Sequence, residues 1–101
     1  MAIRTDPEEN GRRALLDLAA LDGGRILEIG SGDGRFTWTF ADRAEHVTAI
    51  DPDAEQIALA RQNTPAHLRD RVDLQHVGFE DFAAKTSPAA FDFVILSWAL
   101  C

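Results

Sequence analysis

The stretch that decides the fold joins a short apolar run to a glycine-rich turn: Arg25-Ile26-Leu27-Glu28-Ile29-Gly30-Ser31-Gly32-Asp33-Gly34. The apolar run predicts a strand, and the glycines predict a sharp turn that leads into a helix over Phe36–Arg43. Glycines spaced Gly-x-Gly-x-Gly let the backbone bend tightly and let a ligand approach the main chain closely. By itself, the pattern also fits a tight strand-to-helix turn that binds nothing.

Strands and helices alternate on both sides of this stretch. Helical patterns extend from Asp6-Pro7 to Leu21 and from Pro52-Asp53 to Thr64-Pro65, with a short helical turn at Leu68–Arg71. Ala83–Ala90 is predicted to be a loop or a short helix. Because strands and helices alternate, we expect an α/β fold: a Rossmann-like parallel sheet with helices on both faces. The further predicted strands are Val47–Ile50, Val72–Val77 and Phe91–Leu96.

Composition narrows the classes of function. The chain has 101 residues, of which 46% are apolar and 27% charged, as expected for one small globular domain. Its net charge of −7 disfavours binding to nucleic acid or to an anionic membrane. The sequence contains no apolar run of the roughly 20 residues that span a bilayer. A single cysteine favours a reducing compartment, so we expect a cytoplasmic protein, and the three histidines show no metal-ligand spacing.

Two carboxylates beside the turn point to the kind of ligand. Asp51 ends the second predicted strand, where a carboxylate can accept hydrogen bonds from two ribose hydroxyls; it can equally cap the helix that follows. Glu28 comes two residues before Gly30, where it would repel a pyrophosphate. It suits a positively charged ligand group, such as an ammonium or a sulfonium. Dinucleotide sites also differ in their spacing, which is Gly-x-Gly-x-x-Gly.

With these residues in place, the chain resembles the class I S-adenosylmethionine-dependent methyltransferases. The resemblance covers about residues 10–101 and implies S-adenosyl-L-methionine as the cofactor, in a single methyltransferase domain over residues 1–101. It also implies the strand order 3-2-1-4. The matching segments are Ile26–Gly34, Val47–Asp51, Glu80–Phe82 and Phe91–Ser97.

The resemblance implies that the turn wraps the methionine portion of the cofactor. Glu28 is expected to support the turn, and Asp51, followed by Pro52, to hold the ribose hydroxyls. The turn residues assigned to cofactor binding in this way are Gly30, Ser31, Gly32 and Gly34.

Later segments supply the remaining expected contacts. The resemblance implies that Phe79-Glu80 flanks the adenine, with Asp81 as the alternative to Glu80. Ser97, after the fourth strand, is expected near the methionine end. Asp92 matches a residue at the start of that strand, far from the crevice, and is expected to be structural.

The acceptor is less well defined than the cofactor. Ser97-Trp98-Ala99-Leu100 lacks the Asp/Asn-Pro-Pro-aromatic motif of amino-methylating nucleic-acid enzymes, and Cys101 lacks the preceding proline of the cytosine C5 enzymes. The resemblance therefore favours a small-molecule methyl acceptor, with no nucleic acid partner. No catalytic residue can be named, because a general base is needed only for an acceptor that is protonated at the working pH.

The sequence predicts four strands, whereas the resembling fold has seven. We therefore expect the chain to be incomplete relative to that fold, with an exposed edge at the fourth strand that invites self-association or a partner chain. Two other functions stay open at this point. One is an inactive cofactor-binding fragment or partner-dependent subunit, and the other is an NAD-dependent oxidoreductase, which Glu28 and the glycine spacing disfavour.

Overall fold

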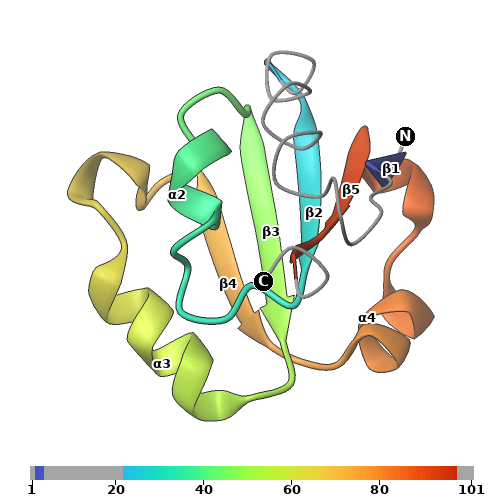
Figure 1. Cartoon of the computed structure of the whole chain (residues 1–101). Coiled ribbons are helices and arrows are strands. Elements are labelled where there is room, and N and C mark those ends of the chain that lie inside the picture. The colour runs from blue at the N-terminus through green and yellow to red at the C-terminus, as the bar shows by residue number, and fades with distance from the viewer. Residues whose placement is uncertain (1, 4–21, 98–101) are drawn as a thin grey trace, which may run out of the picture.

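The computed structural model describes residues 2–3 and 22–97, and it has a parallel sheet at its centre (Figure 1). The strands lie in the order β1-β5-β2-β3-β4. Apart from β1, this is the predicted order 3-2-1-4, so the fold class is confirmed. The helix predicted to end at Leu21 lies outside the described residues, as do Trp98 and Cys101. The strands are β1 Ala2–Ile3, β2 Arg25–Ile29, β3 His46–Asp51, β4 Val72–His76 and β5 Phe93–Leu96.

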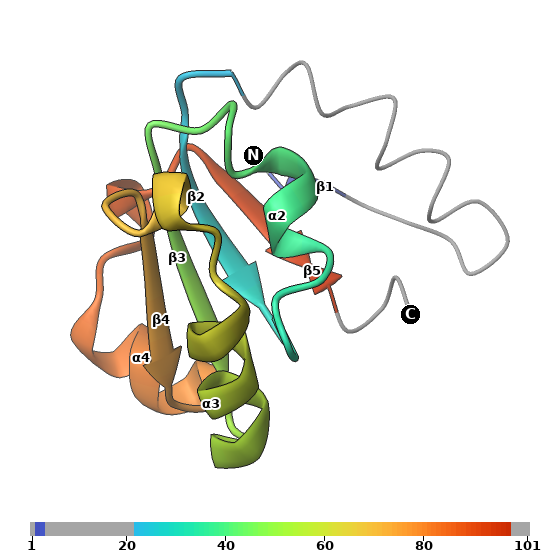
Figure 2. The same ribbon diagram turned by 90° about the vertical axis from the view of Figure 1, so that its left-hand side faces the viewer.

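Helices cover both faces of the sheet. Figure 2 shows α2 and α3 on one face and α4 on the other. Within the described part of the chain, no helix is both long and apolar enough to cross a bilayer. The helical segments are α2 Thr37–Phe40, α3 Ala54–Asn63 and α4 Phe79–Lys85, with single 3-10 turns η2 Ala66–Leu68 and η3 Pro88–Ala90.

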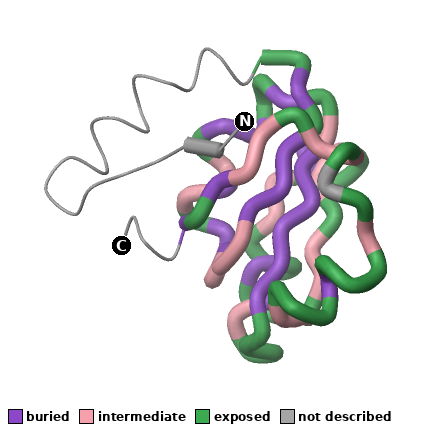
Figure 3. Tube along the Cα trace, turned by 90° about the vertical axis from the view of Figure 1, so that its right-hand side faces the viewer, coloured by how far each residue is buried: buried purple, intermediate pink, exposed green. Residues whose placement is uncertain are grey.

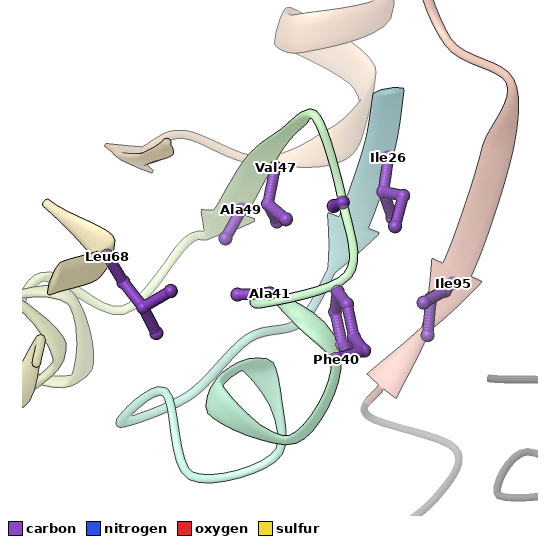
Figure 4. Packing of buried hydrophobic residues seen from close by; sticks show 8 residues of the cluster. Ile26, Phe40, Ala41, Val47, Ala49, Leu68 and Ile95 are labelled. Carbon is purple, nitrogen blue, oxygen red and sulfur yellow. The ribbon is translucent and has the colours of Figure 1, made fainter. Parts of the chain in front are cut away.

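The alternation of side chains along the strands divides the core in two. On β2, Ile26 belongs to the cluster on the α2 face, and Leu27 belongs to the cluster on the α4 face. Phe40 fills the centre of the first cluster (Figure 4), and Phe82 of α4 closes the second. Buried residues follow the central strands in Figure 3, because β2 and β3 are covered on both faces. Residue 28 therefore faces the same side as residue 26, toward α2.

Helix α2 is shorter than the helix predicted over Phe36–Arg43. The hydroxyl of Thr39 donates a hydrogen bond to the carbonyl of Phe36, at 2.6 Å, and the Thr39 N–H reaches the same carbonyl. Such local bonds compete with regular helical bonding. From residue 41 to residue 44 the chain continues as tight turns, in which the N–H groups of Arg43 and Ala44 donate to carbonyls three residues earlier, at 3.0 and 3.2 Å.

Helix α4 begins earlier than predicted. The sequence assigned a loop or short helix to Ala83–Ala90, whereas the helix starts at Phe79, directly after its N-cap Gly78. Two acidic residues in the first turn, Glu80 and Asp81, favour the positive end of the helix dipole. The prediction failed because these acidic residues were assigned to the site rather than to the start of a helix.

The expected open edge at the fourth strand is partly covered. Residues Ala2 and Ile3 form β1 and pair in parallel with Val94 and Ile95 of β5. No strand was predicted there, because two residues leave no detectable alternation. Over these two positions the β5 edge already has a partner strand, so the structure gives no support to self-association through them.

Asp92 joins the start of β5 to the start of β2 by hydrogen bonds. This agrees with the structural role expected for it. Its carboxylate accepts a hydrogen bond from the Arg25 N–H at 2.9 Å, and its own N–H donates to the Arg25 carbonyl at 2.7 Å. We expect Asp92→Ala to lower the free energy of unfolding by about 1 kcal/mol, the usual contribution of one such bond. Urea denaturation measures this loss. Asp70→Ala, at an exposed turn residue, is the control; an equal loss in both variants would contradict the assignment.

Candidate functional site

The glycine-rich turn is held against the neighbouring strand by its backbone. The N–H groups of Gly30 and Ser31 both donate to the carbonyl of Ile50, at 2.9 and 3.2 Å. Gly30, Gly32 and Gly34 have φ angles of 81°, 60° and 89°, in the region that residues with side chains rarely adopt. Glycine is therefore required by the backbone path of the turn, as the sequence pattern predicted.

Three polar residues stand at the carboxyl ends of neighbouring strands, all on the face that α2 covers. Glu28 is near the end of β2, Asp51 ends β3, and Ser97 directly follows β5. All three are buried. Because side chains alternate along a strand, each falls two residues after an inward-facing core residue on the same face. These core residues are Ile26, Ala49 and Ile95.

Glu28 is completely buried on the face of the sheet that α2 covers. Thr37 of α2 donates a hydrogen bond from its hydroxyl to one carboxyl oxygen, and Ser97 donates to the other. Burial raises the pKa of Glu28 from 4.5 to about 7, because removal from water disfavours the charged form; the nearby Asp51 charge adds to this, and the two hydrogen bonds oppose it. Glu28 thus links α2 to the residue after β5 and does not line the hollow beside the turn.

Asp51 connects the turn to the start of α3. One carboxylate oxygen accepts from the Gly32 N–H at 2.9 Å, and the other accepts from the Asp53 N–H at 2.8 Å. The helix-cap role considered for Asp51 is wrong, because Asp53 caps α3 by accepting from the N–H groups of residues 55 and 56. Each carboxylate oxygen has two acceptor sites, so Asp51 retains capacity for ligand hydroxyls.

A hollow of about 610 Å³ opens beside the turn. The hydroxyl of Ser31 is buried and, among the described residues, has no hydrogen-bond partner. A buried polar group normally has one, so this hydroxyl lacks the bond expected of it within the described part of the chain, in a residue that lines the hollow. The close backbone, the unpaired hydroxyl and the nearby carboxylates fit a polar, partly cationic nucleoside cofactor. The hollow is lined by Gly30, Ser31, Gly32, Asp33, Arg35, Phe36, Thr39, Gln56 and Ser97.

Other predicted site residues lie outside this hollow. Pro52 is exposed, and its carbonyl accepts a hydrogen bond from His76 Nε2 at 3.0 Å. Phe79 is half exposed and lines a smaller apolar pocket of about 150 Å³ between α4 and the sheet. Glu80 and Asp81 are exposed on the first turn of α4. The structure does not bring these four residues to the hollow beside the turn.

Sequence analysis missed two kinds of site residue. Thr37, which donates a hydrogen bond to Glu28, was given no role. Arg35 and Gln56 line the hollow, from the turn and from α3. The sequence carries no signal for these residues, since each becomes important only through a neighbour brought close by folding.

Fold and site together define a Rossmann-like domain with a hollow at the carboxyl ends of its strands, where open α/β sheets bind their ligands. Residues 26–101 match the family model described as a methyltransferase domain, and the chain belongs to that family. This confirms the resemblance to the S-adenosylmethionine-dependent methyltransferases.

Individual relatives agree with the family. The chain is 32% identical to an uncharacterized methyltransferase of Staphylococcus carnosus over 89% of this chain and 39% of the relative. It is 37% identical to the ubiquinone biosynthesis O-methyltransferase of Aromatoleum aromaticum, over 75% of this chain and 32% of the relative. A Listeria monocytogenes protein assigned as an S-adenosylmethionine-dependent methyltransferase shares the fold, with a TM-score of 0.70 at 21% identity over 87% of this chain and 38% of that chain. The chain thus spans about two fifths or less of these relatives.

Proposed function

We propose that this protein binds S-adenosyl-L-methionine in the hollow beside the turn and transfers its methyl group to a small-molecule acceptor. The observation that carries the proposal is the meeting of the turn, Asp51 and the unpaired Ser31 hydroxyl at one edge of the sheet. The family of the chain supports the reaction type. The relative named for ubiquinone biosynthesis supports a small molecule with an oxygen acceptor.

In this proposal the protein mainly positions the reactants. S-adenosyl-L-methionine supplies the activated methyl group on its sulfonium. Asp51 accepts hydrogen bonds from the ribose hydroxyls, and the Gly30–Gly34 backbone packs closely against the methionine portion. Ser31 offers its hydroxyl to a polar group of the ligand. Alignment of an acceptor with the methyl group is worth roughly 7–11 kcal/mol in favourable cases.

Asp51→Ala is expected to raise the dissociation constant for S-adenosyl-L-methionine about 10- to 100-fold. A hydrogen bond to a charged group contributes about 1.5–3 kcal/mol, and each 1.4 kcal/mol is tenfold in affinity. Isothermal titration calorimetry measures the change. Asp53→Ala is the control, since it removes the α3 cap at a cost of about 1 kcal/mol in stability while its side chain has no part in the site. Unchanged affinity in Asp51→Ala would refute the ribose assignment.

Binding and turnover need separate measurements. Calorimetry with S-adenosyl-L-methionine tests the cofactor, and a transfer assay with radiolabelled methyl groups and hydroxyl-bearing small molecules tests the reaction. Binding together with transfer supports the proposal in full. Binding without transfer to any acceptor supports a cofactor-binding module instead. Binding of NAD in preference to S-adenosyl-L-methionine would overturn both.

A further inference from the structure

The carboxylate of Asp51 depends for its orientation on the backbone turn that follows β3. One carboxylate oxygen accepts from the Gly32 N–H and the other from the N–H of Asp53, two residues further along the chain. The second bond closes a tight turn over residues 51–53, so the direction of the carboxylate follows the path of that turn. Pro52, at its centre, is exposed and has no N–H. Its carbonyl is therefore the backbone group through which a hydrogen bond can hold it.

That carbonyl is held by His76, the last residue of β4. Strands β3 and β4 pair in parallel as far as Asp51 and His76, and the Val77 N–H donates to the Asp51 carbonyl at 3.1 Å. One residue further along, Nε2 of His76 lies 3.0 Å from the carbonyl oxygen of Pro52. A carbonyl oxygen only accepts, so Nε2 must carry the proton and donate it. The end of β4 thus holds two consecutive carbonyls of the turn, the first through its backbone and the second through a side chain.

Building on the proposed function, we propose that His76 is a positioning residue for the cofactor: it fixes the turn over residues 51–53 and so keeps the Asp51 carboxylate aimed at the ribose hydroxyls. His76 does not line the hollow, so it acts through Asp51 rather than by touching the ligand. Its hydrogen bond comes directly after the last paired residue of β3, where Pro52 has no N–H to continue the strand pairing. The side chain therefore extends the hold of β4 on β3 by one residue, at the point where the ligand is bound.

A purely structural role for His76 has a different consequence. Asp53 caps α3 with its side chain and directly follows Pro52, so a loosened turn also disturbs the start of that helix and lowers the free energy of unfolding. That loss does not depend on the carboxylate of Asp51. A positioning role requires instead that His76 and Asp51 act on the ligand as one unit, so that removing His76 changes the affinity little once the carboxylate is gone.

A double-mutant cycle, measured by calorimetric titration with S-adenosyl-L-methionine, tests the inference. His76→Ala alone is expected to raise the dissociation constant about three- to fivefold, within the range of one neutral hydrogen bond. In the Asp51→Ala background the same change should raise it less than about 1.5-fold. His76→Gln keeps an N–H donor on a side chain of similar reach, so its affinity should stay within about 1.5-fold of the wild type. His67→Ala is the control, because His67 contacts Asp42 rather than the turn.

A second measurement needs no variant. NMR of the His76 ring nitrogens in the ligand-free protein at pH 8 should show the tautomer with its proton on Nε2. Because His76 is exposed, its variants are expected to fold, and urea denaturation checks this. A proton on Nδ1, or equal changes in affinity from His76→Ala with and without the Asp51 carboxylate, would overturn the role of His76 while leaving the proposed function intact. If the wild-type protein does not bind S-adenosyl-L-methionine, the proposed function fails, and this inference fails with it.

Discussion

Gly34→Ala is expected to lower the free energy of unfolding by about 3 kcal/mol. Gly34 has a φ of 89°, and a Cβ added there would lie 2.3 Å from Cζ2 of Trp38. The left-handed backbone costs a residue with a side chain about 1–2 kcal/mol, and overpacking typically costs about 1–3 kcal/mol more. The ring cannot easily yield, because Trp38 packs against the core cluster on the α2 face. Urea denaturation at constant pH measures the loss.

Two other glycines separate the backbone cost from the steric cost. Gly23 has a φ of 72° with open space around its added Cβ, so Gly23→Ala should show the backbone cost alone. Gly78 has a φ of −80° and open space, so Gly78→Ala should lose only the N-cap preference for glycine over alanine, about 0.5–1 kcal/mol. Combining Gly34→Ala with Trp38→Ala should recover part of the steric cost. Equal losses in all three glycine variants would contradict the contact with Trp38.

The stability of the wild-type protein is expected to fall as pH rises from about 4.5 to 7, through Glu28. The unfolded carboxyl has a pKa of 4.5 and the folded one about 7, so the folded state holds the proton more tightly. Below pH 4.5 the Glu28 carboxyl is protonated in both the folded and the unfolded state, so it does not lower the free energy of unfolding. Above 7 both are ionised, and the full penalty of about 3 kcal/mol applies, at about 1.4 kcal/mol per unit of pKa.

Glu28→Gln should remove this dependence. The difference in unfolding free energy between the variant and the wild type is expected to grow in favour of the variant by about 3 kcal/mol from low to high pH. Denaturation curves for both proteins at several pH values test this, because the other titrating groups cancel in the difference. Glu45→Gln, at an exposed residue, serves as the control. A constant difference between Glu28→Gln and the wild type would show that the pKa of Glu28 is not raised.

Prediction from sequence was strongest where structure depends on neighbours along the chain. Strands β2 to β5 and helix α3 follow from apolar runs and capping signals such as Asp53. It was weakest at segment ends, where local side-chain bonds compete with regular structure. After Phe40 the chain changes to tight turns with three-residue backbone bonds, which ends α2 early, and an N-cap glycine followed by two acidic residues starts α4 early. Strand β1 left no signal because its pairing with β5 depends on a partner more than 90 residues away.

The sequence by itself determined the class of site. The glycine spacing requires left-handed backbone within the turn, and Glu28 and Asp51 are placed by their positions at the ends of strands. These properties are local, because each depends only on residues that are close together in the sequence. They were enough to indicate a cofactor with a ribose and a positive charge.

Only the tertiary structure decided what Glu28 contacts. Its two hydroxyl partners come from residues 9 and 69 positions away, and the second meets it because β5 lies beside β2 in the sheet. Burial under α2 then removes the carboxyl from water and raises its pKa. Strand order and helix packing combine contributions from the whole chain. They therefore turned a carboxylate expected to attract a cation into a buried carboxyl group with a raised pKa.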